Sequence, residues 1–286
     1  MSGKIRFAPS PTGYLHEGHL LSALYVWAAA KKWNLKIHLR IEDHDQSRAR
    51  PAYIAGIRED LAWLGFKYDS ESIQSARGQV YEAALQKLKE KSLVYPCYCS
   101  RKQLLAENPQ SETGEIIYQG KCLHETRVIP LPHNLRFIVP NKFIDWHDLR
   151  LGDFHENPKL QCGDFPIRDR DNQWTYQFAV CVDDIDEQIT HIVRGEDIRN
   201  STARQIALME ALGRTERPIY LHHPLIVDAN NKKLSKRELA HSLRQDKEAG
   251  ITPEMLFGRV CHKAHLTESD APIALVDAIS IIMNQL

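Results

Sequence analysis

Two histidines near the start of the chain have a spacing that could serve either a metal ion or a phosphate group. His16 and His19 flank Gly18, directly after the turn sequence Pro-Ser-Pro-Thr-Gly and before a long apolar run. A zinc protease needs histidines four residues apart on one continuous helix. The shorter spacing and the glycine favour a strand–loop–helix junction, where backbone N–H groups and two imidazoles could bind phosphate. Taken alone, the stretch could equally hold two ordinary surface histidines.

A second candidate is the cationic segment Lys232-Lys-Leu-Ser-Lys-Arg237, which follows an Asn-rich turn. Such a segment is most often a solvated surface loop. As a functional element, it would be a mobile loop whose lysines stabilise charge on transferred phosphates. The sequence contains neither a Walker-type loop nor G-x-G-x-x-G. If the protein binds a nucleotide, we therefore expect it to do so without a common glycine-rich loop.

Three cysteines form a third candidate site. Cys97, Cys99 and Cys122 cluster in the sequence, and three thiolates suit structural zinc, which takes four ligands and favours sulfur. Chemistry alone nominates His124 as the fourth ligand, and the alternative is three reduced cysteines without a metal. The other three cysteines, Cys162, Cys181 and Cys261, lie apart and are expected in the core.

Periodic segments around these residues predict the elements that position them. Lys4–Ala8 and Lys36–Ile41 are predicted strands, and Leu20–Trp33 is a predicted helix that is apolar nearly all round and therefore buried. Further helices are expected from Pro51 to Gly65 and over Gly78–Lys91. Regular order returns at 174–182, 189–193, 198–212 and 219–221. This order predicts an α/β fold with a parallel sheet and crossover helices.

The pattern breaks between about Tyr95 and Phe165, a stretch rich in turn residues that also holds the cysteine cluster. We read it as an insertion. The predicted organisation is a first half of the α/β core (1–94), the insertion (95–165), a second half with the Lys232–Arg237 loop (166–245) and a helical C-terminal segment (246–286).

Composition sets wide limits on function. The 286 residues carry a formal net charge of zero, so no global field draws the protein to nucleic acid or anionic lipid. The first residues are too short and too charged for a secretory signal. The longest nearly apolar run, Leu20–Ala30, is about half of a membrane span. We therefore expect a cytoplasmic protein without a membrane partner.

The first two segments together resemble the paired motifs of class I aminoacyl-tRNA synthetases. These are Pro-Ser-Pro-Thr-Gly-x-Leu-His-x-Gly-His and the downstream Lys-Leu-Ser-Lys. Four further blocks resemble the glutamyl branch of that class: 6–13, 40–48, 176–184 and 191–197. The resemblance spans about residues 4 to 240. It implies a Rossmann-like catalytic domain and removes the reading of two ordinary surface histidines.

Glutamate has two carboxylates and one ammonium, so its site should hold fixed cations and at least one acid. Arginines suit bidentate carboxylate recognition, and a glutamate at a strand end suits the ammonium. Each such residue could alone be a structural ion-pair partner. The resemblance implies these glutamate contacts: Arg6, Ser10, Glu42, Tyr176 and Arg194.

The same resemblance implies ATP as a substrate and Mg²⁺ as its companion. The predicted ATP-binding residues are His16, Gly18, His19 and Lys236, of which His16, His19 and Lys236 are also predicted to be catalytic. Glu17 departs from the motif, because the class usually has an apolar residue there. A carboxylate beside phosphates is electrostatically unhelpful, so we expect Glu17 to point to solvent.

Cys-x-Cys…Tyr-x-x-x-Cys resembles the zinc site of the glutamyl-queuosine branch, which implies Zn²⁺ bound by Cys97, Cys99, Tyr118 and Cys122, with His124 as the fallback. Only about fifty residues follow Lys236, whereas a full glutamyl-tRNA synthetase continues into anticodon-binding domains. Both features imply ATP-dependent glutamate activation and transfer to the queuosine base in the anticodon of tRNA(Asp). The alternatives are charging of a tRNA 3′ end by a truncated synthetase and a non-catalytic tRNA-binding paralogue.

Overall fold

The protein folds around a seven-stranded sheet, seen in a computed structural model that describes residues 3–111, 114–125, 132–226 and 241–286. The strands of this sheet are β1 (Lys4–Phe7), β2 (Lys36–Ile41), β3 (Ser70–Ile73), β6 (Ile144–Asp148), β7 (Gly152–Glu156), β9 (His191–Gly195) and β10 (Ile219–His223). Their spatial order is β3-β2-β1-β9-β10-β6-β7, and all neighbours run parallel except the β6–β7 hairpin. The predicted α/β class with a parallel sheet is confirmed.

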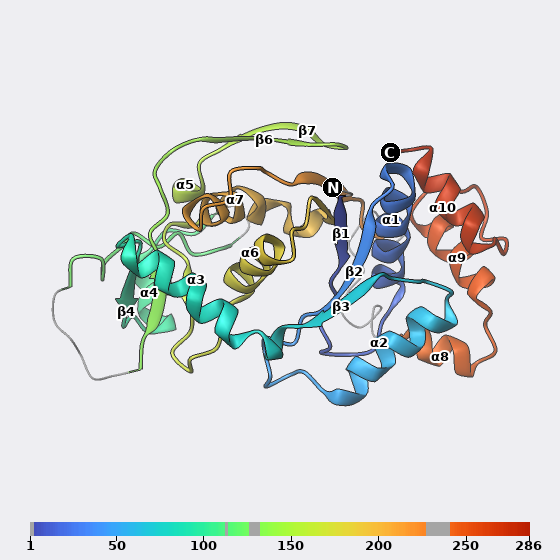
Figure 1. Cartoon of the computed structure of the whole chain (residues 1–286), viewed down its shortest axis with the longest axis horizontal. Helices are drawn as coiled ribbons and strands as arrows, with labels where there is room; N and C mark the ends of the chain where they lie inside the picture. Colours follow the sequence, from blue (N-terminus) through green and yellow to red (C-terminus); the bar gives the residue numbers. More distant parts are fainter. Residues whose placement is uncertain (1–2, 112–113, 126–131, 227–240) are drawn as a thin grey trace.

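Helices connect and cover the strands (Figure 1). They are α1 (Glu17–Trp33), α2 (Pro51–Trp63), α3 (Gly78–Glu90), α4 (Arg101–Glu107), α5 (Pro158–Cys162), α6 (Tyr176–Asp186), α7 (Thr202–Ala211), α8 (Leu243–Glu248), α9 (Pro253–Lys263) and α10 (Leu275–Met283). Two short 3₁₀ helices, η1 (Gln74–Ala76) and η2 (Glu196–Ser201), complete the set. The helix expected over 198–212 therefore begins as a 3₁₀ helix and continues as α7.

Helix α1 is buried as its composition predicts. It lies between the main sheet and helices α9 and α10, which pack on its opposite side (Figure 1). Leu20, Leu24 and Ala28 are almost fully buried. Burying a leucine side chain stabilises the fold by roughly 1.5–3 kcal/mol, so the C-terminal helices contribute to holding α1 on the sheet. The helix ends where Asn34 takes a left-handed conformation.

The middle of the chain forms a second, smaller sheet and also contributes two strands to the main sheet. Strands β4 (Val94–Cys97), β5 (Asn134–Phe137) and β8 (Pro166–Arg168) make a three-stranded antiparallel sheet beside α4. Strands β6 and β7 come from inside the predicted insertion, yet they extend the main sheet next to β10. The residue boundaries proposed for the four segments stay a prediction.

The strand order creates a place for a ligand. Strand β1 has β2 on one side and β9 on the other, and the chain leaves β1 and β9 in opposite directions across the sheet. In open α/β sheets, ligands bind outside the carboxyl ends of the strands at such a point. Within the described residues, no helix is both long and apolar enough to cross a membrane.

Candidate active site

Residues at or just after the carboxyl ends of β1, β2, β9 and β10 line two adjoining cavities, of about 650 Å³ and about 100 Å³. The two cavities share the side chains of His19, Tyr176 and Arg194. The structure thereby brings together these predicted site residues: Arg6, Ser10, His16, Gly18, His19, Glu42, Tyr176 and Arg194. Lys236, the remaining predicted ATP-binding residue, lies outside the described residues.

The histidine pair caps the first turn of α1. His16 is the N-cap residue, and its Nδ1 accepts a hydrogen bond from the backbone N–H of Gly18 at 3.1 Å. In return, Nδ1 of His19 accepts from the backbone N–H of His16 at 3.2 Å. A ring nitrogen that accepts carries no hydrogen, so each neutral imidazole has its N–H at Nε2. Both rings can therefore donate to an anion at the helix N-terminus.

Burial keeps these two imidazoles neutral. It lowers the pKa of His16, although the nearby Glu17 opposes this, and lowers the pKa of His19 to about 3, with a further contribution from His16. The two rings lie close together, with 3.9 Å between their centroids and a tilt of 44° between their planes. At pH 7 the pair thus acts through hydrogen bonds rather than through positive charge.

Arg194 is a buried cation with neutral partners. Its Nε donates to Nε2 of His222 at 3.0 Å, Nη1 to Gln205 at 2.7 Å and Nη2 to Thr202 at 2.8 Å. The residue is 5% exposed, and its guanidinium forms no ion pair within the described ranges. Three of its five N–H groups are used, which leaves one hydrogen on each terminal nitrogen. This arrangement can hold an anionic group in the cavity.

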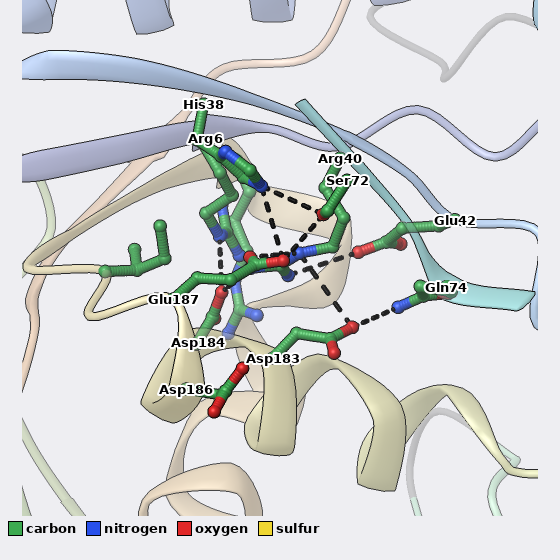
Figure 2. Close-up of polar contacts among 12 residues, drawn as sticks. Arg6, His38, Arg40, Glu42, Ser72, Gln74, Asp183, Asp184, Asp186 and Glu187 are labelled. Atoms are coloured by element: carbon green, nitrogen blue, oxygen red, sulfur yellow. Dashed lines mark hydrogen bonds and ion pairs between the residues drawn. The ribbon is translucent and has the colours of Figure 1, made fainter. Parts of the chain in front are cut away.

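Arg6, on the neighbouring strand, has a carboxylate partner instead. Its Nε lies 3.1 Å from Asp184 at the end of α6. Asp184 also accepts from Nη2 of the fully buried Arg40 at 2.5 Å, and Arg40 in turn binds Glu187 at 2.7 Å. Figure 2 shows Arg40 in the middle of this network, surrounded by acidic groups from α6 and from the residues just after α6 and β2.

Glu42 borders this network and lines the smaller cavity. Its carboxylate lies 3.6 Å from Nη1 of Arg40, and within the described residues it accepts no hydrogen bond. Burial raises the pKa of Glu42 to about 7, although Arg40 and Arg6 oppose the rise. A buried carboxylate without a hydrogen-bond donor is costly, so this group suits a cationic ligand such as an ammonium.

The expectation that Glu17 points to solvent is wrong. Glu17 forms ion pairs with Arg259 at 2.7 Å and with Lys263 at 2.6 Å, both on α9, and its side chain is 13% exposed. Two cations therefore compensate its charge. The carboxylate joins the start of α1 to α9 and does not present an uncompensated charge to the end of the cavity beside His16 and His19.

The three clustered cysteines converge in space beside the second sheet. Their sulfur atoms all lie within 4.8 Å of one another, and all three residues are buried. The hydroxyl of Tyr118 lies 3.5 Å from Sγ of Cys97 and 3.7 Å from Sγ of Cys99. His124 is exposed and is not part of the group. Three sulfurs and one phenolic oxygen thus form a closed donor set that fits a tetrahedral zinc ion.

Neighbouring residues hold Tyr118 in this position. The guanidinium of Arg136 lies 3.9 Å from the centre of the Tyr118 ring, and the hydroxyl accepts a hydrogen bond from the backbone N–H of Cys122 at 2.9 Å. Gly163 has a positive φ of 63° and packs against the Tyr118 backbone, where any side chain would collide. Arg136, the Cys122 backbone and the close approach of Gly163 therefore hold the phenol beside the thiols.

Sequence reasoning missed several residues that hold the site together. Asp184 lies in the block 176–184, which resembles the glutamyl branch, and a pair of acids in an apolar helix could have indicated buried partners. Arg40 begins the block 40–48, which resembles the glutamyl branch, but nothing in that block indicates that its side chain pairs with acids on α6. His222 lies outside the four blocks and contacts Arg194 only through the pairing of β9 with β10. Asp148 gave no signal, because its partner lies on another strand far along the chain.

The family model described as tRNA synthetases class I (E and Q), catalytic domain, matches residues 4–280. A glutamyl-Q tRNA(Asp) synthetase from Neisseria meningitidis serogroup C is 38% identical over 277 residues, which are 95% of this chain and 92% of that protein. A glutamate–tRNA ligase from Aquifex aeolicus is 40% identical over 268 residues, but these are 90% of this chain and 56% of that protein.

Solved structures agree with the sequence relatives. A glutamate–tRNA synthetase from Elizabethkingia anophelis superposes with a TM-score of 0.76 at 27% identity, over 98% of this chain. A glutamate tRNA ligase from Elizabethkingia meningosepticum, described as in complex with its amino acid, gives 0.77 at 27% identity. The chain spans 65% and 64% of these two proteins, so it corresponds to part of each.

Proposed function

Because the chain belongs to the family of class I tRNA synthetases for glutamate and glutamine, we propose that it activates glutamate with ATP and transfers it to the queuosine base in the anticodon of tRNA(Asp). The observation that carries this proposal is the cavity in which Arg194, without a carboxylate partner among the described residues, faces the same space as Glu42 and the histidine pair. Such a cavity combines a cation for carboxylates, a carboxylate for an ammonium group and N–H groups that can donate hydrogen bonds to phosphate.

Glutamate fills the part of the cavity next to the sheet. Arg6 and Arg194 bind its carboxylates, Glu42 binds its ammonium, and Ser10 and Tyr176 complete the contacts. The buried guanidinium of Arg194 supports this assignment, because an unpaired buried cation is costly until an anion binds. Glu42 supports it in the same way, since an ammonium would supply the donors that its carboxylate lacks.

ATP binds with its phosphates beside His16, Gly18 and His19. An oxygen of the glutamate α-carboxylate attacks the α-phosphorus, the bond to the bridging oxygen breaks, and pyrophosphate leaves with the electron pair. The Nε2–H groups of the two histidines and the α1 N-terminus donate to the phosphate oxygens as charge builds up. Lys236 is proposed to add a cation here, and Mg²⁺ is the expected companion of ATP.

The second step transfers the glutamyl group. A hydroxyl of the queuosine cyclopentenediol attacks the carbonyl carbon of glutamyl-adenylate, the bond to the phosphate oxygen breaks, and AMP leaves. The queuosine target is supported by the Neisseria relative, of which the alignment covers 92%, against 56% of the Aquifex ligase. No protein nucleophile is needed, since the acyl phosphate is already activated.

We propose that Cys97, Cys99, Tyr118 and Cys122 hold a structural zinc ion. The ion would join Tyr118 and Cys122 to the end of β4 in the second sheet. Burial opposes ionisation of Cys97, yet the Tyr118 hydroxyl and the Arg136 guanidinium lower the pKa of its thiol. A zinc ion would stabilise the thiolates and supply folding energy rather than chemistry.

The zinc proposal predicts one zinc per chain in freshly purified protein, with a clear drop in melting temperature after chelation. Tyr118→Phe keeps the ring but removes the oxygen, so we expect weaker zinc retention in a competition with a chromophoric chelator. Tyr95→Phe is the matched control, because the Tyr95 hydroxyl binds Asp164 instead. Protein without zinc, or equal retention by the Tyr118 and Tyr95 variants, would remove the proposal.

The proposed function is tested by following radioactive glutamate on tRNA(Asp). Transfer is expected to queuosine-containing tRNA(Asp) and not to queuosine-free tRNA(Asp), with the label in an anticodon-loop fragment after nuclease digestion. Label on the 3′-terminal adenosine would instead identify an enzyme that charges tRNA, which the Aquifex relative represents. Absence of glutamate-dependent ATP–pyrophosphate exchange, with and without tRNA, would favour a non-catalytic tRNA-binding protein.

A further inference from the structure

The β6–β7 hairpin contacts His222 at three groups: its backbone N–H, its backbone carbonyl and its ring. Asp148, at the end of β6 and fully buried, accepts a hydrogen bond through Oδ2 from the backbone N–H of His222 at 2.9 Å. The same oxygen lies 2.6 Å from Nδ1 of the His222 ring. Arg150, two residues on, donates to the backbone carbonyl of His222 at 2.6 Å. The hairpin thus fixes both the backbone and the ring of one residue on β10.

These contacts determine which ring nitrogen of His222 carries the hydrogen. An ionised carboxylate only accepts, so Nδ1 must donate to Asp148. Burial opposes ionisation of Asp148, but hydrogen bonds from His222 and from the backbone N–H groups of Leu151 and Arg150 lower its pKa. Nε2 therefore has a free lone pair, and it accepts from Nε–H of Arg194 at 3.0 Å. The hydrogen bonds of the His222 ring with Asp148 and with Arg194 therefore require the same tautomer, with the hydrogen on Nδ1.

We propose that Asp148 and His222 are positioning residues that orient the guanidinium of Arg194 for the carboxylate of the substrate. The inference rests on the proposed function, because it takes Arg194 as the glutamate contact. Gln205 and Thr202 fix the two terminal nitrogens, and His222 fixes Nε, so the guanidinium plane is determined by three acceptors. A segment within the predicted insertion thereby acts on the amino-acid site.

Asp148→Asn tests this relay, defined as the hydrogen bonds from Arg194 to His222 and from His222 to Asp148, with a side chain of the same shape. Oδ1 would still accept from the backbone N–H groups of Arg150 and Leu151, which Asp148 now caps at 3.0 Å each. The amide nitrogen, which replaces Oδ2, would donate to Nδ1 of the ring and move the ring hydrogen to Nε2, where it faces the Nε–H of Arg194. It would also leave the backbone N–H of His222 without its acceptor, an effect that the double variant with His222→Gln measures separately. We expect the KM for glutamate to rise about tenfold and the KM for ATP to stay within about twofold.

A second pair of variants separates positioning from general damage. His222→Gln keeps an acceptor for Arg194 and has no ring tautomer, so it should restore most of the affinity for glutamate that His222→Leu loses. In the His222→Gln background, adding Asp148→Asn should raise the glutamate KM by less than about twofold. Asp153→Asn, on the exposed face of the same hairpin, is the control and should leave both KM values unchanged.

The readout is glutamate-dependent ATP–pyrophosphate exchange at varied glutamate and ATP, with melting temperatures measured in parallel. If the wild-type protein supports no exchange, the proposed function fails and this inference fails with it. If the wild type is active and Asp148→Asn matches it in glutamate KM, only the relay is overturned. An equal rise in both KM values, or equal defects of the Gln and Leu variants at 222, would also overturn it.

Discussion

The two arginines of the cavity sit in opposite electrostatic surroundings. The Arg6 side, defined as Arg6, Arg40, Glu42 and Asp184, pairs cations with carboxylates. The Arg194 side, defined as Arg194, Thr202, Gln205 and His222, offers only neutral acceptors to its cation. One arginine is therefore compensated before a ligand arrives, and the other is not.

This difference separates structural charge from functional charge. Breaking a buried pair leaves an uncompensated ion and costs about 3–5 kcal/mol of folding free energy. The Arg6 side thus carries much of the local stability. On the Arg194 side, the cost of the buried cation is already present in the folded protein, and a bound carboxylate would relieve it. We infer that the selectivity of the site for an anionic substrate comes mainly from Arg194.

The largest expected effect is on the Arg194 side. Arg194→Leu should lower kcat/KM for glutamate by about 1,000-fold, equivalent to about 4 kcal/mol, because the anionic group loses its buried cation. The unfolding free energy should change by no more than about 1 kcal/mol, since the lost partners are neutral. Exchange kinetics and urea unfolding measure the two quantities. If Arg194→Leu instead destabilised the fold while the folded protein kept a normal kcat/KM for glutamate, Arg194 would have a structural role and the comparison would be wrong.

The next effect belongs to the Arg6 side. Asp184→Asn should lower the unfolding free energy by about 3 kcal/mol, because Arg6 and Arg40 lose their shared carboxylate. Urea unfolding at pH 7 measures it. Asp186→Asn is the matched control on the same helix, since that carboxylate is 52% exposed and should contribute little. Equal effects of the two variants would contradict the structural role of the buried network.

The same carboxylate predicts a pH dependence of stability. Burial opposes ionisation of Asp184, but Arg6 and Arg40 hold its pKa below the ordinary value. A depressed folded-state pKa contributes stability above the unfolded-state pKa of about 3.9, and this contribution is lost as the pH falls through the folded-state value. The Asn variant should therefore lose less stability than the wild type in this acid range.

A smaller effect concerns the carboxylate that faces the cavity. Burial raises the pKa of Glu42 to about 7, and only its ionised form attracts an ammonium. Calorimetric titration with glutamate should therefore show affinity about tenfold weaker at pH 6 than at pH 8. In Glu42→Gln the affinity should be low and nearly independent of pH. A variant that keeps the wild-type pH dependence would assign the titration to another group.

The smallest effect involves a carboxylate that faces away from the cavity. Glu17→Gln should lower the unfolding free energy by about 1 kcal/mol, because its ion pairs with Arg259 and Lys263 are only partly buried. The KM for ATP should stay within about twofold, since the charge at position 17 is already compensated. Thermal unfolding and exchange kinetics test both statements. A marked gain in ATP affinity would place Glu17 beside the phosphates instead.

The parts of the site that follow local patterns could be predicted from the sequence. The spacing of His16, Gly18 and His19 predicts the loop and helix start. Three cysteines in one short stretch of an otherwise cysteine-poor chain predict the thiol cluster, because structural zinc favours sulfur ligands. Alternation and apolar runs predict the strands and helices of the core. Apart from the 23-residue separation of Cys99 and Cys122, these signals act within a few residues along the chain.

The supporting contacts could not be predicted in this way. Asp148, His222 and Asp184 meet their partners only after the sheet has formed, and nothing beside them in the sequence identifies those partners. The solvent-facing prediction for Glu17 failed for the same reason, because α9 lies at the other end of the chain. Tertiary packing of distant elements, rather than local pattern, decides which charges are compensated.

The amino-acid dependence of ATP–pyrophosphate exchange tests the central claim most directly. A buried cation without a counter-charge favours the more anionic of two ligands of equal shape. The account predicts exchange with glutamate and a kcat/KM for glutamine lower by about 1,000-fold or more. Comparable exchange with glutamine, or none with glutamate, would contradict it.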